Sequence, residues 1–218
     1  MNNLLQARWE KGKGNTVHFY TKKLPWKSKQ FNRELYLPDY FAGMIGDKKE
    51  VAIAELGAGM FCTIGSLWKT AKVTVYPSDA LADEFSRVLK DNGVVPFIPV
   101  EKQDMENLTY PDGFFDIVHC CNALDHCMDP AKALMEMHRV CKPGGYIYLR
   151  HFTNVGEHEK YSGLHIWNID MAGGKDCIIW NQVKSFLLSS SFEGFTTVKK
   201  KELDYETTDM VVSILKKP

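Results

Sequence analysis

The sequence lacks several features that mark particular classes of protein. No apolar stretch among its 218 residues is long enough to span a bilayer, and Met1-Asn2-Asn3 does not begin a secretory signal. The 27 basic and 27 acidic residues cancel, so the charge balance favours neither nucleic acid nor a membrane surface as a partner. The chain has no internal repeat and no low-complexity segment. We therefore expect a cytoplasmic protein with no nucleic acid and no membrane among its partners.

Paired C-x-x-C motifs are also absent, although the chain has six cysteines: Cys62, Cys120, Cys121, Cys127, Cys141 and Cys177. Several of these cysteines lie in apolar runs. Such residues behave as small buried hydrophobic side chains in a reducing compartment. We therefore expect free thiols and predict no metal site.

The most informative stretch is an apolar run that ends in an acid and two glycines, Val51-Ala52-Ile53-Ala54-Glu55-Leu56-Gly57-Ala58-Gly59. An unbroken apolar run is typical of a strand buried on both faces of a parallel sheet. Glycines after it allow a sharp turn and a close approach of a ligand to the backbone. Pyrophosphate-binding folds use G-x-G-x-x-G, but here Cys62 takes the third glycine position and Glu55 adds negative charge. The turn therefore suits a ligand with positive charge better than a pyrophosphate.

Two motifs resemble those of the class I S-adenosylmethionine-dependent methyltransferases. Glu55-Leu56-Gly57-Ala58-Gly59 is similar to the first motif of that family, although Phe61 stands where the family usually has a further glycine. Arg139-Val140-Cys141-Lys142-Pro143-Gly144-Gly145 is similar to the segment that ends a helix before the fifth strand. The resemblance covers the chain from about residue 50 onward and implies S-adenosyl-L-methionine as the cofactor.

Strand and helix patterns alternate from Val51, as expected of a parallel sheet covered on both faces. The expected strands are 51–56, 72–76, 94–100, 114–120, 146–150, 195–200 and 210–216. The expected helices are 63–70, 80–92, 130–141, which Asp129 caps, and 181–190. The resemblance implies a Rossmann-like three-layer α/β sandwich, with a mostly parallel seven-stranded sheet and an antiparallel C-terminal hairpin.

We expect one class I methyltransferase domain over residues 1–218, with a core from residue 46 and an N-terminal arm over 1–45. The arm contains aromatic residues among lysines and glycines, and a possible helix over 28–44 that Pro38 breaks or kinks. Two roles stay open for it. It either packs on the sheet as a structural arm or closes as a lid over a small-molecule site.

The resemblance and the position of loops after strands give the expected cofactor site. Ligands of open α/β sheets lie outside the carboxyl ends of the strands. The expected cofactor-binding residues are Glu55, Gly57, Ala58, Gly59, Met60, Asp79, Ala80, Asp104, Met105, Glu106, Asn122 and Ala123. Asp79 is placed to accept hydrogen bonds from ribose hydroxyls, or alternatively to cap the following helix.

His126 is the candidate catalytic residue. It ends a Leu-x-His segment that in the family lies beside both cofactor and substrate, and the pKa of an imidazole suits a general base. The alternative is a structural histidine that orients its loop. The candidate substrate-binding residues are His18, Tyr20, His151, His165 and Trp167.

The expected reaction is methyl transfer to a small-molecule substrate. Asn122-Ala123-Leu124-Asp125-His126 and Gly163-Leu164-His165-Ile166-Trp167-Asn168 resemble small methyltransferases of bacterial capsule and surface-polysaccharide assembly. That resemblance implies O-methylation of a sugar or an activated capsule precursor. The alternatives are a non-catalytic module of the same fold that binds a cofactor or a partner and, less favoured by the motifs, a dehydrogenase.

Overall fold

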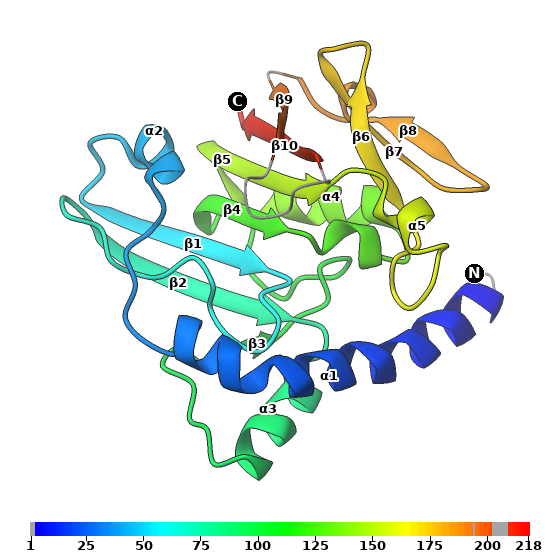
Figure 1. The fold of residues 1–218 in the computed structure, drawn as a ribbon. Helices are drawn as coiled ribbons and strands as arrows, with labels where there is room; N and C mark the ends of the chain where they lie inside the picture. The colour runs from blue at the N-terminus through cyan, green and yellow to red at the C-terminus, as the bar shows by residue number, and fades with distance from the viewer. Residues whose placement is uncertain (1–2, 194, 202–208) are drawn as a thin grey trace.

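A seven-stranded sheet forms the centre of the computed structural model, which describes residues 3–193, 195–201 and 209–218 (Figure 1). Its strand order is β3-β2-β1-β4-β5-β10-β9, and only β10 is antiparallel to its neighbours. The strands are β1 (Glu50–Leu56), β2 (Lys72–Asp79), β3 (Glu101–Lys102), β4 (Phe115–Cys121), β5 (Cys141–Phe152), β9 (Phe195–Lys201) and β10 (Asp209–Lys216). The expected mostly parallel sheet with an antiparallel C-terminal hairpin is confirmed.

A second, three-stranded antiparallel sheet occupies the long connection after β5. It consists of β6 (Asn168–Ala172), β7 (Asp176–Trp180) and β8 (Ser185–Leu187), in that order. Ile169 and Ile179 pack in the same buried cluster as Met137 of the helix α4. The small sheet therefore takes part in covering one face of the central sheet, where a helix was expected.

The helices are mostly short apart from the first. They are α1 (Asn3–Phe31), η1 (Asp39–Phe41), α2 (Ala42–Ile45), α3 (Ala82–Asp91), η2 (Leu124–His126), α4 (Pro130–Val140), α5 (Val155–His158) and η3 (Leu188–Ser190). Asp129 caps α4 as expected, because its side chain accepts hydrogen bonds from the backbone of Ala131 and Lys132. Within the described part of the chain, no helix has both the length and the apolar character that crossing a bilayer requires.

The two faces of the central sheet bury different clusters, because successive residues of a strand point to opposite sides. Ala54 and Leu56 of β1 pack on the side of α4 and the small sheet. Val51 and Ile53 pack on the other side, against the segment that contains η1 and α2. A third cluster joins α1 to α3 and to the loop after β1 at the edge where the strands end.

Four expected elements are wrong. The arm does not form a helix over 28–44: α1 occupies residues 3–31, and the chain then runs irregularly to Pro38. Residues 63–70 contain no helix, since Ser66 and Leu67 donate their N–H groups to Leu35 O instead of to their own preceding turn. The expected strand at 94–100 is irregular, and only Glu101–Lys102 pairs with β2.

The fourth wrong element is the helix over 181–190. Residues 181–184 form a turn in which Asn181 N donates to Lys184 O. The chain then returns as β8, in which Phe186 pairs with Ile179. Pairing with β7 buries this segment against the small sheet, and tertiary packing overrides the helical pattern of its sequence.

Candidate cofactor and acceptor site

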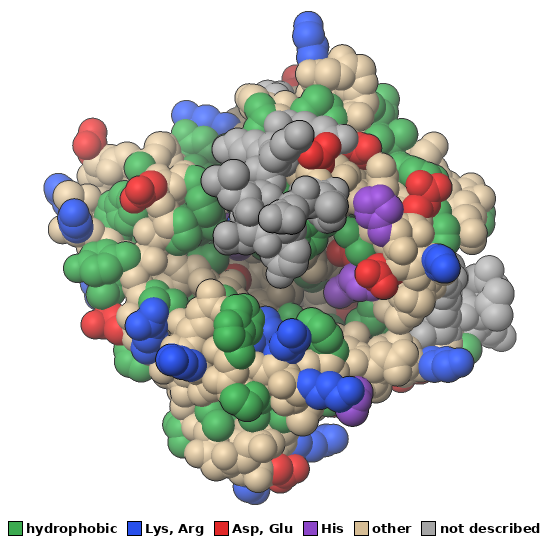
Figure 2. Space-filling model, in the orientation of Figure 1, with side chains coloured by type: hydrophobic (Ala, Val, Ile, Leu, Met, Phe, Trp, Pro, Cys, Tyr) green, Lys and Arg blue, Asp and Glu red, His purple; other side chains and the backbone are tan. Residues whose placement is uncertain are grey.

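A cavity of about 490 Å³ lies at the carboxyl ends of β1, β2 and β4. Figure 2 shows this face of the molecule hollowed above α1, whose lysine side chains follow the lower rim. Ten of the expected site residues line the cavity: Tyr20, Gly57, Asp79, Ala80, Asp104, Met105, Glu106, Asn122, Ala123 and His126. The volume falls within the range of small-molecule and cofactor sites.

The glycine turn is fixed to the end of the neighbouring strand. Gly57 and Gly59 have φ angles of 73° and 71°, a conformation that glycine adopts without strain. The N–H groups of Gly57 and Ala58 donate to Ser78 O at 2.8 and 3.0 Å. A Cβ on Gly57 would lie 2.2 Å from the Cβ of Ala123, so the turn leaves no room for a larger residue there.

Asp79 joins this turn to the start of α3. Its Oδ2 accepts from Gly59 N at 2.9 Å, and its Oδ1 accepts from Leu81 N at 2.8 Å. Burial raises the pKa of Asp79 to about 6, although the two backbone hydrogen bonds favour the charged form. A carboxylate has about four lone-pair sites, so Asp79 retains acceptor capacity toward the cavity that it lines.

Glu55 lies behind the turn and outside the cavity lining. Its side chain is buried and accepts hydrogen bonds from the backbone N–H and the hydroxyl of Thr63. Burial raises the pKa of Glu55 to about 7, and the hydrogen bonds from Thr63 oppose this shift. Ala58, Gly59 and Met60 are also buried behind the cavity wall. The contacts of Glu55 therefore shape the loop that follows β1.

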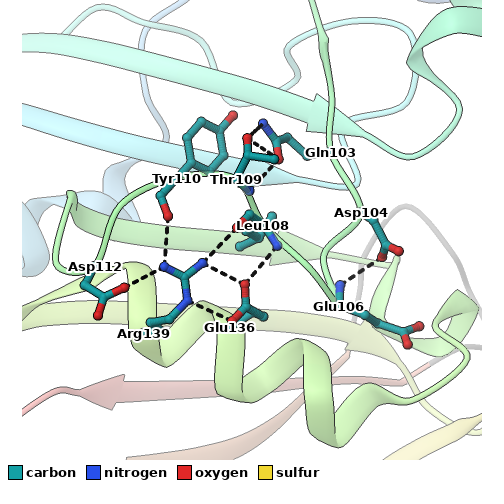
Figure 3. Close-up of polar contacts among 9 residues, drawn as sticks. All are labelled: Gln103, Asp104, Glu106, Leu108, Thr109, Tyr110, Asp112, Glu136 and Arg139. Atoms are coloured by element: carbon teal, nitrogen blue, oxygen red, sulfur yellow. Dashed lines mark hydrogen bonds and ion pairs between the residues drawn. The ribbon is translucent and has the colours of Figure 1, made fainter.

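The chain that follows Asp104 and Glu106 is held from α4 (Figure 3). Arg139 donates to Glu136, to Asp112 and to two backbone carbonyls, Leu108 O at 2.8 Å and Tyr110 O at 2.9 Å. Glu136 in turn accepts from Leu108 N at 2.9 Å. The arginine of the sequence motif before β5 thus fixes the chain just after the cavity-lining residues 104–106.

Asn122 and Ala123 follow β4 and complete this side of the cavity. Asn122 has a φ angle of 50°, a left-handed conformation that asparagine tolerates. Its Oδ1 accepts from Phe152 N at 2.9 Å, which ties the loop after β4 to the end of β5. Glu106 accepts from Met128 N, which joins the loop after β3 to the same region.

The N-terminal helix α1 forms one wall of the cavity, in the arm for which the sequence left both a structural role and a lid role open. Trp9, Lys13 and Thr16 of α1 line the cavity together with Tyr20. A Cβ on Gly59 would lie 2.5 to 2.8 Å from the ring of Tyr20, so this helix packs directly on the glycine turn. His18 lies on the exposed side of α1, outside the cavity lining. Residues two apart on a helix face different sides. If the sequence had predicted α1, it would have indicated that His18 and Tyr20 do not both face the cavity.

A cluster of Asp125, His126 and His165 adjoins the acceptor side of the cavity, and His126 is its member in the cavity lining, whereas Asp125 and the expected substrate residue His165 lie outside that lining. Asp125 Oδ2 lies 2.7 Å from His165 Nδ1 and 3.5 Å from His126 Nε2. Burial alone would raise the pKa of Asp125, but the charges of His126 and His165 lower it to about 2. Burial lowers the pKa of His126 against the opposing effect of Asp125, whereas Asp125 outweighs burial and raises the pKa of His165.

Two other candidate substrate residues lie behind this cluster and not in the cavity lining. His151, near the end of β5, is 3% exposed, and burial lowers its pKa to about 4. Trp167 is buried and donates from Nε1 to Cys127 O at 2.9 Å. The hydrogen bond of Trp167 supports the loop just after His126. Asp125 was named only within the motif, since the sequence gives no sign that it meets His165.

The cavity fits the group that the motifs imply. S-adenosylmethionine has a ribose and charged ammonium and sulfonium groups, which match a lining that includes the carboxylates Asp79, Glu84, Asp104, Glu106 and Asp129. The glycine turn offers the backbone of Gly57 at close range, because Gly57 lines the cavity and has no side chain. The Asp79 carboxylate at the end of β2 lies next to this turn, because it accepts a hydrogen bond from Gly59 N.

Comparisons with known proteins agree with this site. Residues 57–149 match a family model described as a methyltransferase domain. The ubiquinone/menaquinone biosynthesis C-methyltransferase UbiE of Coxiella burnetii (strain RSA 493 / Nine Mile phase I) is 30% identical over 110 residues, which are 50% of this chain and 36% of that protein. The UbiE of Shewanella oneidensis is 28% identical over 119 residues, which are 55% of this chain and 39% of that protein. The chain spans little more than a third of the length of these curated relatives.

Solved structures give the fold. A chain of the complex between the Haloferax volcanii Trm112 methyltransferase activator and the putative methyltransferase aligns with a TM-score of 0.53 at 13% identity, over 94% of this chain and 96% of that chain. The CurJ carbon methyltransferase aligns with a TM-score of 0.51 at 15% identity, over 81% of this chain and 51% of that chain. Residues 57–149 are thus similar to a methyltransferase domain, and the solved structures show that the chain has a Rossmann-like α/β fold.

Proposed function

We propose that the protein is an enzyme that transfers a methyl group from S-adenosylmethionine to a small molecule. The observation that carries this proposal is the cavity at the carboxyl ends of β1, β2 and β4, where the glycine turn and Asp79 meet. The cofactor supplies the activated methyl group. The glycine turn, Asp79 and residues 104–106 hold the cofactor, and catalysis comes largely from positioning the acceptor in line with the methyl group.

His126 is the residue that we propose for handling the acceptor's proton. It lines the cavity, and its Nε2 faces Asp125 and His165. A hydroxyl acceptor has to lose a proton as the methyl group is transferred, and a positioned base speeds such a step by about 10²–10⁴-fold. Asp125 stabilises the imidazolium that forms, because its carboxylate lies 3.5 Å from His126 Nε2.

For the acceptor we propose a hydroxyl of a sugar or of an activated capsule precursor, on the resemblance of residues 122–126 and 163–168. A carbon acceptor is the second candidate, because the relatives reported above are described as C-methyltransferases of quinone biosynthesis. The protein's Trp9, Lys13 and Leu164 line the cavity on the side of the histidine cluster and supply both apolar and charged contacts for either acceptor.

The cofactor is tested by the thermal midpoint of the protein with S-adenosylhomocysteine and with NAD. A ligand that binds only the folded state raises the midpoint, by about 2.7 kcal/mol of stability at 100 times its dissociation constant. We expect stabilisation by S-adenosylhomocysteine alone. Stabilisation by NAD would favour a dehydrogenase, and cofactor binding without methyl transfer to any sugar nucleotide or quinol would favour a non-catalytic module.

A further inference from the structure

Three metal-ligating atoms meet beside the cavity, and His126 is the residue among them that lines it. Asp125 Oδ2, His126 Nε2 and His165 Nδ1 are separated by 2.7, 3.2 and 3.5 Å. An ion placed about 1 Å above the plane of these atoms would lie about 2.1 Å from all three, which is the usual length of a zinc–nitrogen or zinc–oxygen bond. The spacing of the three atoms therefore fits one shared ion.

Hydrogen bonds alone do not satisfy all three contacts among Asp125, His126 and His165, because one pair of atoms has no proton to share. Asp125 Oδ2 accepts a hydrogen bond from the N–H of His165 Nδ1. His126 Nε2 lies 3.2 Å from that same nitrogen, whose single N–H already points to the carboxylate. If His126 Nε2 also donates to Asp125, the two ring nitrogens face each other as donors. A cation satisfies all three contacts at once, because each atom then offers a lone pair.

Hydrogen bonds to backbone oxygens hold the two segments of this cluster next to each other. Ile166 N donates to Asp125 O at 3.1 Å, and Trp167 Nε1 donates to Cys127 O at 2.9 Å. Trp9 of α1 donates from Nε1 to His126 O at 3.2 Å. The ligand atoms therefore belong to a site that is built before any ion binds, although Asp125 and His165 are 40 residues apart in the sequence.

His151 is an independent observation at the same place. Its side chain is 3% exposed, and both ring nitrogens lack a hydrogen-bond partner among the described residues. The charges of Asp125 and His126 both act on His151, so it lies near the cluster. A buried imidazole with two free nitrogens is costly unless something pairs with it, and a cation or its bound water would do so.

We propose that Asp125, His126 and His165 bind one divalent transition-metal cation of the zinc type. Two imidazoles and one carboxylate favour Zn(II), Co(II) or Fe(II) over Mg(II), which prefers oxygen ligands. The sequence predicted no metal here, because the prediction considered cysteine spacing and not the meeting of distant loops.

Three protein ligands would leave a coordination position for a further ligand, and His126 is the one of the three that lines the cavity. An acceptor hydroxyl bound to the ion would have a lowered pKa and would release its proton to solvent water before it takes up the methyl group, since the cation stabilises the alkoxide. This consequence rests on the proposed methyl transfer, whereas the binding of the cation does not. In the metal-bound protein His126 is a ligand of the ion. His126 can act as a general base only in the metal-free protein.

The test is a titration of chelator-treated protein with Co(II), Zn(II) and Mg(II), in the absence of S-adenosylmethionine. We expect one equivalent of Co(II) or Zn(II) to bind and Mg(II) not to bind. Asp125→Asn and His165→Gln should each weaken binding at least 100-fold. His158→Gln, which changes an exposed histidine outside the cluster, should bind as the wild type does. Equal affinity in all four proteins, or no binding to the wild type, would overturn the proposal.

A second measurement uses the unmodified protein, so that it does not depend on the folding of a variant. The X-ray absorption spectrum of the zinc-loaded wild type should show nitrogen and oxygen ligands and no sulfur. Sulfur ligation would place the ion on cysteines and refute the site. Because the titration contains no cofactor, a protein that binds Co(II) but not S-adenosylhomocysteine would keep this proposal and remove the proposed function.

Discussion

The two walls of the cavity are built in different ways. The cofactor wall consists of the glycine turn, Asp79 and residues 104–106, and contacts between loops that follow neighbouring strands, with support from α4, hold it together. The histidine wall consists of residues 125–127 and 164–167, which only tertiary contacts bring together. The position of the first wall follows from the strand ends of the fold. The second depends on α1 and on the loop before the small sheet.

The largest effect is expected at the histidine wall. His126→Ala should lower turnover by about 10²–10⁴-fold, since the acceptor loses either its base or its metal ligand. Affinity for S-adenosylhomocysteine should change little, because the cofactor wall stays intact. Steady-state kinetics and calorimetric titration give the two values, and His158→Ala is the matched control.

The pH dependence of that rate has a defined sign. Burial lowers the pKa of His126 below its ordinary 6.5. The neutral imidazole is the form that accepts a proton or binds an ion. The wild-type rate should therefore fall only as the pH drops below the lowered pKa of His126. A rate that rises at acid pH would contradict both roles. If His126→Asn is fully active, the residue only orients its loop.

The next effect should appear at the cofactor wall. Asp79→Ala should weaken binding of S-adenosylhomocysteine by on the order of 2–4 kcal/mol, because hydrogen bonds to a charged group are lost. The melting temperature should also fall, since Gly59 N and Leu81 N lose their acceptor. Asp83→Ala, at an exposed residue in the first turn of α3, is the control. A fall in stability with unchanged affinity would make Asp79 only a structural residue.

A smaller effect on stability is expected behind the cofactor wall. Because burial raises the pKa of Glu55 to about 7, the folded protein binds a proton there that the unfolded chain releases between about pH 4.5 and 7. The free energy of unfolding should therefore fall as the pH rises through this window. Glu55→Gln should reduce the difference between pH 5 and pH 8 by on the order of 1–3 kcal/mol, measured by urea unfolding. Glu50→Gln, an exposed strand residue, should leave the difference as it is, and an unchanged slope in Glu55→Gln would refute the assignment.

The smallest effect tests whether α1 supports the histidine wall. A Cβ on Gly12 would lie 2.7 Å from the Leu164 side chain and 2.8 Å from the Gly163 backbone, next to His165. Gly12→Ala should therefore displace the helix and raise KM for the acceptor severalfold. Gly14→Ala meets nothing within 4 Å and should only stabilise the helix, by about 0.5–1 kcal/mol. Equal KM values in the two variants would show that the helix does not set the acceptor side.

The two walls also differ in how far the sequence predicts them. The glycine turn, Asp79 and the arginine before β5 stand at fixed distances from strand ends, so local pattern and resemblance locate them. His165 and Asp125 come together through the loop after α5, for which no periodicity exists. The expected helix at 63–70 failed for the same reason, because its backbone bonds go to Leu35, distant in sequence. A short stretch of sequence does not indicate which distant residues it will contact.

The most direct test of the account is a calorimetric titration of the wild type and of Gly57→Ala with S-adenosylhomocysteine. The Cβ of the variant would collide with Ala123, and both residues line the cavity. We predict one binding site in the wild type and at least a tenfold loss of affinity in Gly57→Ala, with circular dichroism showing that the variant is folded. A wild type that does not bind, or a folded Gly57→Ala with unchanged affinity, would contradict the placement of the cofactor at this turn.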